Sequence, residues 1–362
     1  QEFTVKSVNK SRYHWITGAF VFRQTINRKV DLSRFTDTTR HLTNSGIPTQ
    51  GIAFYHQSTL DLLQGLSCSV GLRYDYEHTR CDFSKVQQPL NGNGETKSLE
   101  QFNRSLHFGQ FTPRFSMQYL SSHNQLFYAS VSKGYKAGGF NVSFLNNDDY
   151  LYSPEYNWNY EIGTKLSFLN NRLSADLSLF YIDWRNQQIT NTIPTVGNVI
   201  RNAGRSRNKG IEASFQARPT KSWMMYMNYG YTDARFVHYQ KEERGILKDY
   251  GGNYLPMVPR HTFSLTTGYS FYDICSWIDR LTLNAGVSVT GPIYWYEDNQ
   301  AKQSPYALVN LRISINKGCF TWEAWSKNLT NTDYLSYYFV TSKAYAQKGK
   351  PITLGTSVSI SL

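Results

Sequence analysis

Apolar and polar residues alternate along much of this chain with a period of two. In the stretch ITLGTSVSISL, the residues Ile352, Leu354, Val358, Ile360 and Leu362 are apolar, and those between them are small or hydroxylated. The same alternation recurs in HTFSLTTGYSF, RLTLNAGVSVTG, LSCSVGLRYDYE and NYEIGTKLSF. A period of two predicts β-strands with two unlike faces, and no helical period competes with it.

The alternation predicts about 14 strands. No apolar run approaches the ~20 residues that a membrane-spanning helix needs, but this limit does not apply to strands, whose alternation makes them polar on average. The predicted strands are centred on residues 12–24, 50–61, 66–80, 104–120, 125–135, 156–169, 172–190, 198–217, 222–238, 257–272, 280–294, 304–316, 319–329 and 351–361.

The connections between these strands alternate between short and long. Up-and-down strands then place all short turns at one end and all long loops at the other, as in outer-membrane barrels. The predicted strands, of roughly 10–15 residues, also exceed the five or six of soluble sheets and suit a tilted span of ~9–11. Short turns are expected at 61–65, 121–124, 169–171, 218–221, 273–279 and 316–318, longer connections at 25–49, 81–103, 136–155, 239–256 and 330–350, and intermediate ones at 191–197 and 295–303.

Two environments could lie on either side of such strands. We expect the apolar phase to face lipid and the polar phase, with ion pairs such as Arg73 with Asp75, to line a wet interior. A soluble sandwich or propeller is the alternative, although neither predicts alternating connection lengths. Packing of the apolar residues against one another in the middle of the molecule would overturn the membrane interpretation.

The amino-acid composition limits the classes of molecule that this protein could bind. The chain has 362 residues, 40% of them hydrophobic, with 27 Tyr, 21 Phe, a formal net charge of +12 and a pI near 9.3. Its Lys and Arg are dispersed and no basic helix or known module appears, which disfavours nucleic acid as the partner. An anionic ligand or an anionic surface facing the basic loops explains the charge better.

The chain shows no catalytic or metal-binding constellation. Its eight histidines are scattered, and H-E-x-x-H, P-loop, G-x-S-x-G and CxxC motifs are absent from the sequence. We therefore expect no enzyme activity, no metal site and no cofactor. Four cysteines are too few for a disulfide framework at this length, and a bridge between Cys275 and Cys319 stays open.

Several segments resemble a known family. SVSKGYKAGGFN (residues 130–141) is similar to a recurring segment of TonB-dependent outer-membrane receptors. Five others match in the family's order: NYEIGTKLSFLNNRLSADLSLFYIDWRNQQI, RNAGRSRNKGIEASFQARP, LPMVPRHTFSLTTGYSF, WSKNLTNTDYLSYYF and GKPITLGTSVSISL. The family has a 22-stranded barrel with a plugged lumen. The resemblance implies that residues 1–362 form a single β-barrel domain, the C-terminal portion, without the plug and the first strands, and Leu362 stands where the family usually ends in an aromatic.

The resemblance also implies a location and a function. The protein would lie in the outer membrane and take up a scarce ligand, a ferric siderophore first, powered by the TonB complex through an N-terminal segment absent from this sequence. Iron would be present only within the transported chelate, and the other partners would be lipid and lipopolysaccharide. Alternatives are a cobalamin or oligosaccharide importer, a passive channel of about 14 strands, and a soluble β carbohydrate-binding domain.

The candidate ligand contacts lie in the long loops and near the outer rim. Aromatic faces and guanidinium groups suit a flat, anionic iron chelate through stacking, cation–π contact and charge. By position the candidates are Tyr294, Trp295, Tyr296, Tyr337, Tyr338, Arg201 and Arg205; interfacial aromatics and lipopolysaccharide-facing cations are the other interpretation. The segment KGYKAGGF is interpreted as a structural bend at the rim, formed by Lys133, Gly134, Tyr135, Lys136, Gly138, Gly139 and Phe140.

Overall fold

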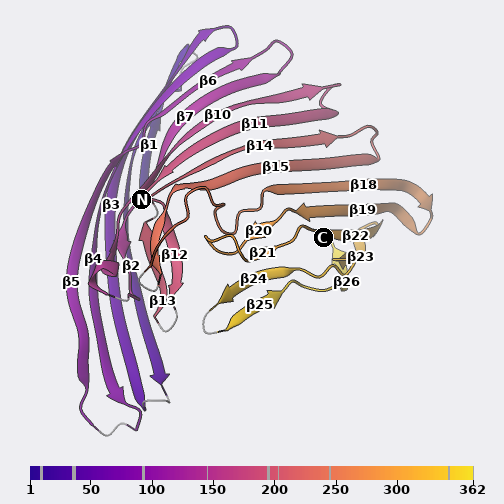
Figure 1. Ribbon diagram of the computed structural model, residues 1–362. Helices are drawn as coiled ribbons and strands as arrows, with labels where there is room; N and C mark the ends of the chain where they lie inside the picture. Colours follow the sequence, from indigo (N-terminus) through magenta and orange to yellow (C-terminus); the bar gives the residue numbers. More distant parts are fainter. Residues whose placement is uncertain are drawn as a thin grey trace. The chain divides into compact units, whose positions relative to one another are not determined.

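The chain is an all-β protein with antiparallel pairing in its ladders (Figure 1). A computed structural model describes residues 1–8, 11–34, 38–91, 94–144, 146–193, 196–202, 204–243, 246–340 and 343–361. Within these ranges the helical content is one short 3-10 turn, η1 (Asn147–Tyr150). No helix in the described part is long and apolar enough to cross a membrane.

One large sheet contains 16 of the strands found in the described residues. Its hydrogen-bonded order is β1-β2-β3-β4-β6-β7-β10-β11-β14-β15-β18-β19-β22-β23-β26, with β5 beside β4, so β1 and β26 end the path. The strands are β1 (Glu2–Lys6), β2 (Tyr13–Arg34), β3 (Thr39–Leu63), β4 (Leu66–Pro89), β5 (Lys97–Phe111), β6 (Arg114–Leu120), β7 (Leu126–Lys136), β10 (Glu155–Phe168), β11 (Leu173–Arg185), β14 (Arg205–Ala217), β15 (Trp223–His238), β18 (His261–Cys275), β19 (Ile278–Thr290), β22 (Tyr306–Lys317), β23 (Phe320–Lys327) and β26 (Thr353–Ile360).

Short strand pairs occupy the long connections between neighbours in the large sheet. They are separate two-stranded ladders rather than members of that sheet, and Figure 1 labels β12 with β13, β20 with β21, and β24 with β25. Among the described residues, the predicted alternation of short turns and long connections is therefore confirmed from residue 121 onward. The pairs are β8 (Gly139–Phe140) with β9 (Leu151–Tyr152), β12 (Gln188–Ile193) with β13 (Gly197–Asn202), β16 (Gln240–Glu243) with β17 (Ile246–Asp249), β20 (Ile293–Tyr294) with β21 (Lys302–Gln303), and β24 (Leu335–Val340) with β25 (Ala344–Lys348).

The strand count of about 14 is not confirmed. The short strand β1 was not predicted, and the predicted strand 104–120 is two strands, because Pro113 lacks the N–H that a continuous ladder needs. The expected long connections 25–49 and 81–103 are wrong for most of their length, since β2 to β5 continue through them. Apolar residues are sparse in these extensions, so the hydrophobic alternation that marks a strand is weak there.

The chain divides into two compact units. Unit 1 comprises residues 1–116, 131–158 and 184–203, and unit 2 comprises 117–130, 159–183 and 204–362. Strands β6, β7, β10 and β11 contribute residues to both. The prediction of a single barrel domain over 1–362 stays a prediction, and each unit is described by itself below.

The two phases of the strands in unit 2 lie on opposite faces of the sheet. On β26 the side chains of Leu354, Val358 and Ile360 are 71%, 66% and 56% exposed. The opposite face carries polar contacts, such as the 3.3 Å hydrogen bond between Ser314 and Glu323. The apolar residues are therefore not packed against one another in a protein interior, as a soluble sheet would require.

Buried side chains are few, and they gather in the loops and the strand ends next to them. In unit 1 the residues Cys81, Phe83 and Phe140 form a buried cluster. In unit 2 a second group includes Phe236, 1% exposed, and Leu255, 5% exposed. All four cysteines are free, so the bridge between Cys275 and Cys319 does not form. These small cores fix the long connections.

Candidate ligand-binding site

Aromatic side chains from two loops of unit 2 come together. The ring centroid of Trp295, which follows β20, lies 6.4 Å from those of Tyr337 and Tyr338 on β24. Tyr296 lies 6.2 Å from Tyr338 in an edge-to-face arrangement, which aromatic pairs favour. Trp295 is only 6% exposed, whereas Tyr337 is 41% exposed. We call these four residues the loop aromatic cluster; all of them are among the predicted ligand contacts.

Two hydrogen bonds tie the loops that carry the cluster. The side-chain oxygen of Gln303 on β21 accepts a 2.8 Å hydrogen bond from the backbone N–H of Leu335, which opens β24. At the other end of β24, the backbone N–H of Val340 donates to the Tyr296 hydroxyl at 2.6 Å. Burial raises the pKa of Tyr296, so its hydroxyl stays neutral near pH 7. The two loops are therefore fixed to each other at both ends of β24.

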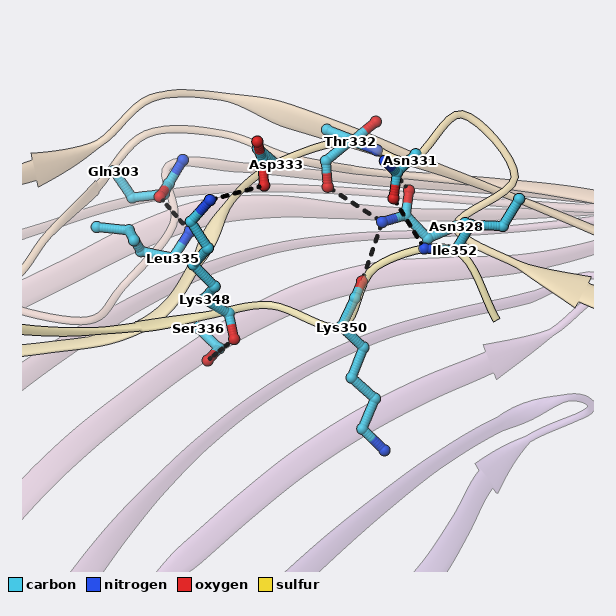
Figure 2. A network of polar contacts seen from close by, with 10 residues as sticks. All are labelled: Gln303, Asn328, Asn331, Thr332, Asp333, Leu335, Ser336, Lys348, Lys350 and Ile352. Atoms are coloured by element: carbon cyan, nitrogen blue, oxygen red, sulfur yellow. Dashed lines mark hydrogen bonds and ion pairs between the residues drawn. The ribbon is translucent and has the colours of Figure 1, made fainter. Parts of the chain in front are cut away.

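A network of side-chain amides closes the base of the β24–β25 hairpin (Figure 2). The Nδ2 of Asn328 donates to the carbonyls of Thr332 and Lys350, both at 3.0 Å, and its Oδ1 accepts from the Thr332 N–H at 2.8 Å. The Oδ1 of Asn331 accepts from the Ile352 N–H at 3.0 Å. We call Asn328 and Asn331 the amide clasp.

The backbone of the clasp explains why asparagine is used. Asn328 and Asn331 have φ of 50° and 49°, in the left-handed region where asparagine is several-fold enriched over other non-glycine residues. Figure 2 also shows Lys348 reaching Asp333 at 3.4 Å, but these side chains are 75% and 87% exposed, so that pair adds little. The hairpin base therefore depends on amides rather than on ions.

Tyr294 belongs to a different group. Its ring stacks on that of Tyr254, with centroids 5.5 Å apart and planes at 9°. The guanidinium carbons of Arg235 and Arg260 lie 4.0 and 4.8 Å from the centroid of the Tyr254 ring, so two cations share one aromatic partner. Sequence reasoning missed these three partners, because only the fold brings residues 235, 254, 260 and 294 together.

The two predicted arginines are already paired with carboxylates. In unit 1, Arg201 binds both oxygens of Asp149, at 2.7 and 2.9 Å. In unit 2, Arg205 binds Asp183 at 2.6 Å. A ligand anion would have to compete with these carboxylates, which are largely buried. Their role as ligand contacts stays a prediction, and the structure brings neither arginine into the loop aromatic cluster.

The first half of KGYKAGGF lies on β7 and contacts β10. The ammonium of Lys133 lies 5.3 Å from the Tyr156 ring centroid, and that of Lys136 lies 3.8 Å from the carboxylate of Glu155. A Cβ added at Gly134 would lie 2.9 Å from the side chain of Asn157, too close without a shift. Tyr135 has a buried hydroxyl without a hydrogen-bond partner among the described atoms.

The second half of KGYKAGGF allows a tight approach to β9. A Cβ at Gly138 would clash with the backbone carbonyl of Tyr152, and one at Gly139 with the Tyr152 ring. The next residue, Phe140, is 6% exposed and packs in the buried cluster of unit 1 with Phe83. The two glycines let the backbone approach Tyr152 closely, and the buried Phe140 ring anchors the segment. This geometry favours the interpretation of KGYKAGGF as a structural bend.

Another cation on an aromatic surface lies in unit 1 and was missed from the sequence. Arg104 on β5 is exposed, and its guanidinium lies 5.1 Å from the Tyr150 ring centroid and 5.8 Å from that of Phe102. Burial, and then a hydrogen bond to Glu100, raise the pKa of Tyr150 to about 12. The alternation in QFNRSLHF could have placed Arg104 with Phe102, but the contact with Tyr150 needed the fold.

Among the described residues, no group of three or more His, Cys, Asp or Glu side chains could hold a metal ion. The aromatic and cationic groups above are instead suited to stacking and charge contacts with a planar anion. The expectations of no cofactor and no enzyme activity stay expectations.

Comparison with known proteins connects these features to a family. Residues 4–331 match the family described as TonB dependent receptor-like, beta-barrel. The pesticin receptor of Yersinia pestis is 24% identical over 354 residues, covering 94% of this chain and 48% of that protein. A probable TonB-dependent siderophore receptor of Acinetobacter baumannii, PiuA, is 26% identical over 241 residues, covering 62% of this chain and 30% of that protein.

A solved structure shares the fold. The crystal structure of the ferric yersiniabactin uptake receptor FyuA from Yersinia pestis superposes with a TM-score of 0.81 at 19% identity, covering 99% of this chain and 53% of that one. This chain therefore spans about half the length of the relatives it matches over most of its residues.

Proposed function

Because this chain belongs to the TonB-dependent receptor family, whose members lie in the outer membrane, we propose that the protein imports a ferric siderophore with energy from the TonB complex. The observation that carries the proposal is a sheet with an exposed apolar face whose loops gather an aromatic cluster. The similarity to the probable siderophore receptor PiuA and to the ferric yersiniabactin uptake receptor FyuA supports iron chelates as the ligand class.

The barrel itself is part of the proposal. We propose that these strands are a portion of a 22-stranded barrel whose lumen holds a plug, as in the family. In support, the sheet path has two ends, β1 and β26, whose outer edges carry backbone groups that further strands could pair. Iron would pass only as part of the chelate, so the protein itself would need no cofactor.

The proposed ligand contacts start with the loop aromatic cluster. Tyr337 is the most exposed of these four rings, and Trp295 is buried behind it, so Tyr337 would touch the ligand while Trp295 supports it. The proposed set also includes Tyr294, Arg201 and Arg205. Each arginine could contact the ligand only if a ligand anion displaced its carboxylate partner, Asp149 for Arg201 and Asp183 for Arg205. An aromatic face is worth about 1 kcal/mol to a stacked partner beyond its buried area.

An uptake experiment tests the proposal. Cells lacking the gene are supplied with radiolabelled iron bound to catecholate, hydroxamate or yersiniabactin-type chelators, and uptake is compared with that of the parent strain. We expect the cells lacking the gene to lose the energy-dependent uptake of iron from at least one chelator class. Equal uptake by the two strains from every chelator would refute the siderophore proposal.

A pair of substitutions then tests the site. Tyr337→Ala should weaken chelate binding roughly fivefold to tenfold, because an exposed stacking surface is lost. Tyr272→Ala removes an equally large ring, 52% exposed, next to the short turn between β18 and β19, and should leave binding unchanged. Equal effects of the two substitutions would exclude the loop aromatic cluster as the contact surface.

The other ligands remain outcomes of the same experiment. Uptake of cobalamin or an oligosaccharide, with no chelator dependence, would redirect the proposal within the family. The soluble carbohydrate-binding alternative is set aside, because the family is an outer-membrane family and the apolar phase is exposed rather than packed.

A further inference from the structure

The polar face of unit 2 carries a groove of about 620 Å³ across strands β18, β19, β22 and β23. One row of residues, each opposite the next across a strand pair, consists of Gly268, Asn284, Arg312, Trp325 and Gly355. Period two places a second row on the same face, one step nearer the loops, with Thr266, Gly286, Asn310 and Lys327. We call this site the strand groove.

Glycines open the strand groove, because its two largest neighbours of Arg312 lean apart over them. A Cβ added at Gly355 would clash with the Trp325 ring, and one added at Gly268 would clash with the Asn284 amide. Both of these glycines lie on the far side of their neighbour from Arg312. A Cβ at Gly286 would make only ordinary contacts, the nearest at 3.6 Å, so the floor there is bare backbone.

The strand groove has an excess of positive charge. The Arg312 side chain is 54% exposed, and its guanidinium lies 3.8 Å from the carboxylate of Glu323. That carboxylate also accepts hydrogen bonds from two serine hydroxyls, Ser314 at 3.3 Å and Ser357 at 3.4 Å. Lys327 is exposed, lies 5.3 Å from the Trp325 ring centroid, and has no carboxylate partner among the described residues. Two cations and one shared carboxylate therefore leave room for an anion.

The strand groove is separate from the loop aromatic cluster. Asn284 is the central residue of the 13 in β19, six positions from either end of the strand. The loop aromatic cluster lies instead on β20, β24 and the residues that follow β20. A ligand in the strand groove would thus have left the loops and moved along the polar face, which would line the lumen of the proposed barrel.

From this arrangement we propose that the strand groove is a transit site for an aryl anion, the catecholate or phenolate ring of an iron chelate. Trp325 offers an aromatic surface to the ring, and Arg312 offers parallel donors to a pair of oxygens, with the Lys327 charge beside them. The site rests on the proposed function and narrows its ligand class. A neutral hydroxamate chelate has neither the aromatic ring nor the negative charge that these side chains match.

The test uses the full-length protein, purified from outer membranes in detergent, with 5-fluorotryptophan in place of tryptophan. The fluorine resonances of Trp325 and Trp322 are assigned with W325F and W322F. They are then titrated with the gallium complex of 2,3-dihydroxybenzoate, a diamagnetic substitute for the ferric complex. Trp322 lies on the opposite, apolar face of the same strand and is 42% exposed, so it is the matched control. We expect a saturable shift of the Trp325 resonance and none of the Trp322 resonance.

Two double variants test the cations. R312Q/K327Q should bind the dihydroxybenzoate complex roughly tenfold more weakly at Trp325, because charge-assisted hydrogen bonds are lost. R280Q/K221Q removes two exposed cations near the short turns of unit 2 and should bind within about twofold of wild type. Equal losses in the two variants, or no loss in R312Q/K327Q, would overturn the proposal. An equally strong Trp325 shift with the gallium complex of acetohydroxamate would overturn the aryl preference and the proposal with it.

Folding and function are checked separately. If R312Q/K327Q does not give the wild-type far-ultraviolet spectrum, K327Q replaces it, with an expected loss of about threefold. Iron uptake from aryl and hydroxamate chelates is measured in parallel on cells that make the wild type. Absent uptake from every chelator, with the Trp325 shift intact, would count against the proposed function alone. Uptake with an unresponsive Trp325, as when another segment of the longer protein fills the strand groove, or uptake from hydroxamates only, would count against the transit site alone.

Discussion

The two units fix their long loops by different chemistry. In unit 1 the connection between β7 and β10 packs Phe144 and Tyr150 onto Phe83 and Phe102, with ring centroids 4.8 to 6.1 Å apart. In unit 2 the connection between β23 and β26 is closed by the amide clasp, whose hydrogen bonds go to backbone groups. One loop is held by burial and the other by directed polar contacts.

Because the two loops are held differently, substitutions in them should change stability differently. An apolar cluster loses stability in proportion to the volume removed and tolerates a side chain of similar size. A hydrogen-bonded clasp leaves buried backbone groups unsatisfied when its central side chain is lost, and no apolar substitute can replace it. Three substitutions and one change of pH test this difference between the units.

The largest effect is expected at Phe83, which is 3% exposed. Phe83→Ala should lower the local free energy of unfolding of unit 1 by about 3–5 kcal/mol, because it leaves a cavity between Phe102 and Phe144. Hydrogen exchange of residues 139–152 should accelerate accordingly. Phe83→Leu should cost less than about 1.5 kcal/mol, and unchanged exchange in Phe83→Ala would contradict the burial account.

The second effect is expected at Asn328, which is 4% exposed. Asn328→Ala should loosen the β24–β25 hairpin by about 2–3 kcal/mol, since the Thr332 N–H and the Lys350 carbonyl lose their partner. Limited proteolysis between residues 329 and 352 measures the opening. Asn328→Gly separates the causes: it also removes the hydrogen bonds but tolerates φ of 50°, so it should be about 1 kcal/mol milder.

A smaller effect is expected at Gln303, which is 8% exposed. Gln303→Ala breaks the bond from the Leu335 N–H and the 2.8 Å bond that the Gln303 Nε2 donates to the neighbouring Ser304 carbonyl. The first of these joins the two loops, and its loss should cost about 1 kcal/mol, with faster exchange of the Leu335 amide. The control Gln300→Ala changes an exposed glutamine whose side chain bonds only within its own loop, to the Asp298 carbonyl. Equal effects of the two would mean that Gln303 does not join the loops.

The smallest effect concerns pH. A hydrogen bond from Arg40, and then the Arg40 charge, lower the pKa of Asp31, and these side chains are 46% and 47% exposed. A lowered pKa in the folded state gives stability that is present above the unfolded value of ~3.9 and lost as pH falls through the folded value. Hydrogen exchange, corrected for its intrinsic pH dependence, should show constant protection of the β2–β3 end between pH 5 and 8 and a decrease only below about pH 4.

The amide clasp provides the contrast at the same pH. Asn328 and Asn331 do not titrate, so protection of the β24–β25 base should not follow the β2–β3 end. Asp31→Asn should abolish the acid-dependent change at the β2–β3 end. Persistence of that change in Asp31→Asn would assign it to another group.

Much of the fold could be predicted from the alternation alone. The predicted strand 351–361 is β26 (Thr353–Ile360), and the predicted 222–238 is β15 (Trp223–His238). These succeed because each strand separates two unlike environments, which forces period two. The extensions of β2 to β5 were not predicted, because their apolar residues are few: the stretch 27–33 has only Val30 and Leu32, too short an alternation to mark a strand.

The candidate site was predictable in its residue types and not in its partners. Trp295, Tyr296, Tyr337 and Tyr338 were predicted as loop aromatics and do meet. Arg201 was predicted as a ligand contact, but the sequence did not reveal its ion pair with Asp149, 52 positions away. Local pattern cannot reveal such a pair, because nothing in either segment depends on the other.

The alternation in the sequence was enough to predict strands with one apolar and one hydroxyl-rich face, joined by short turns and long connections. Those features depend on neighbours along the chain, through the geometry of the extended backbone. Only the folded chain shows which cations are neutralised, which rings stack, and that Arg235 and Arg260 share the ring of Tyr254. Charge and stacking act across space, between residues that only strand register and loop closure bring within reach.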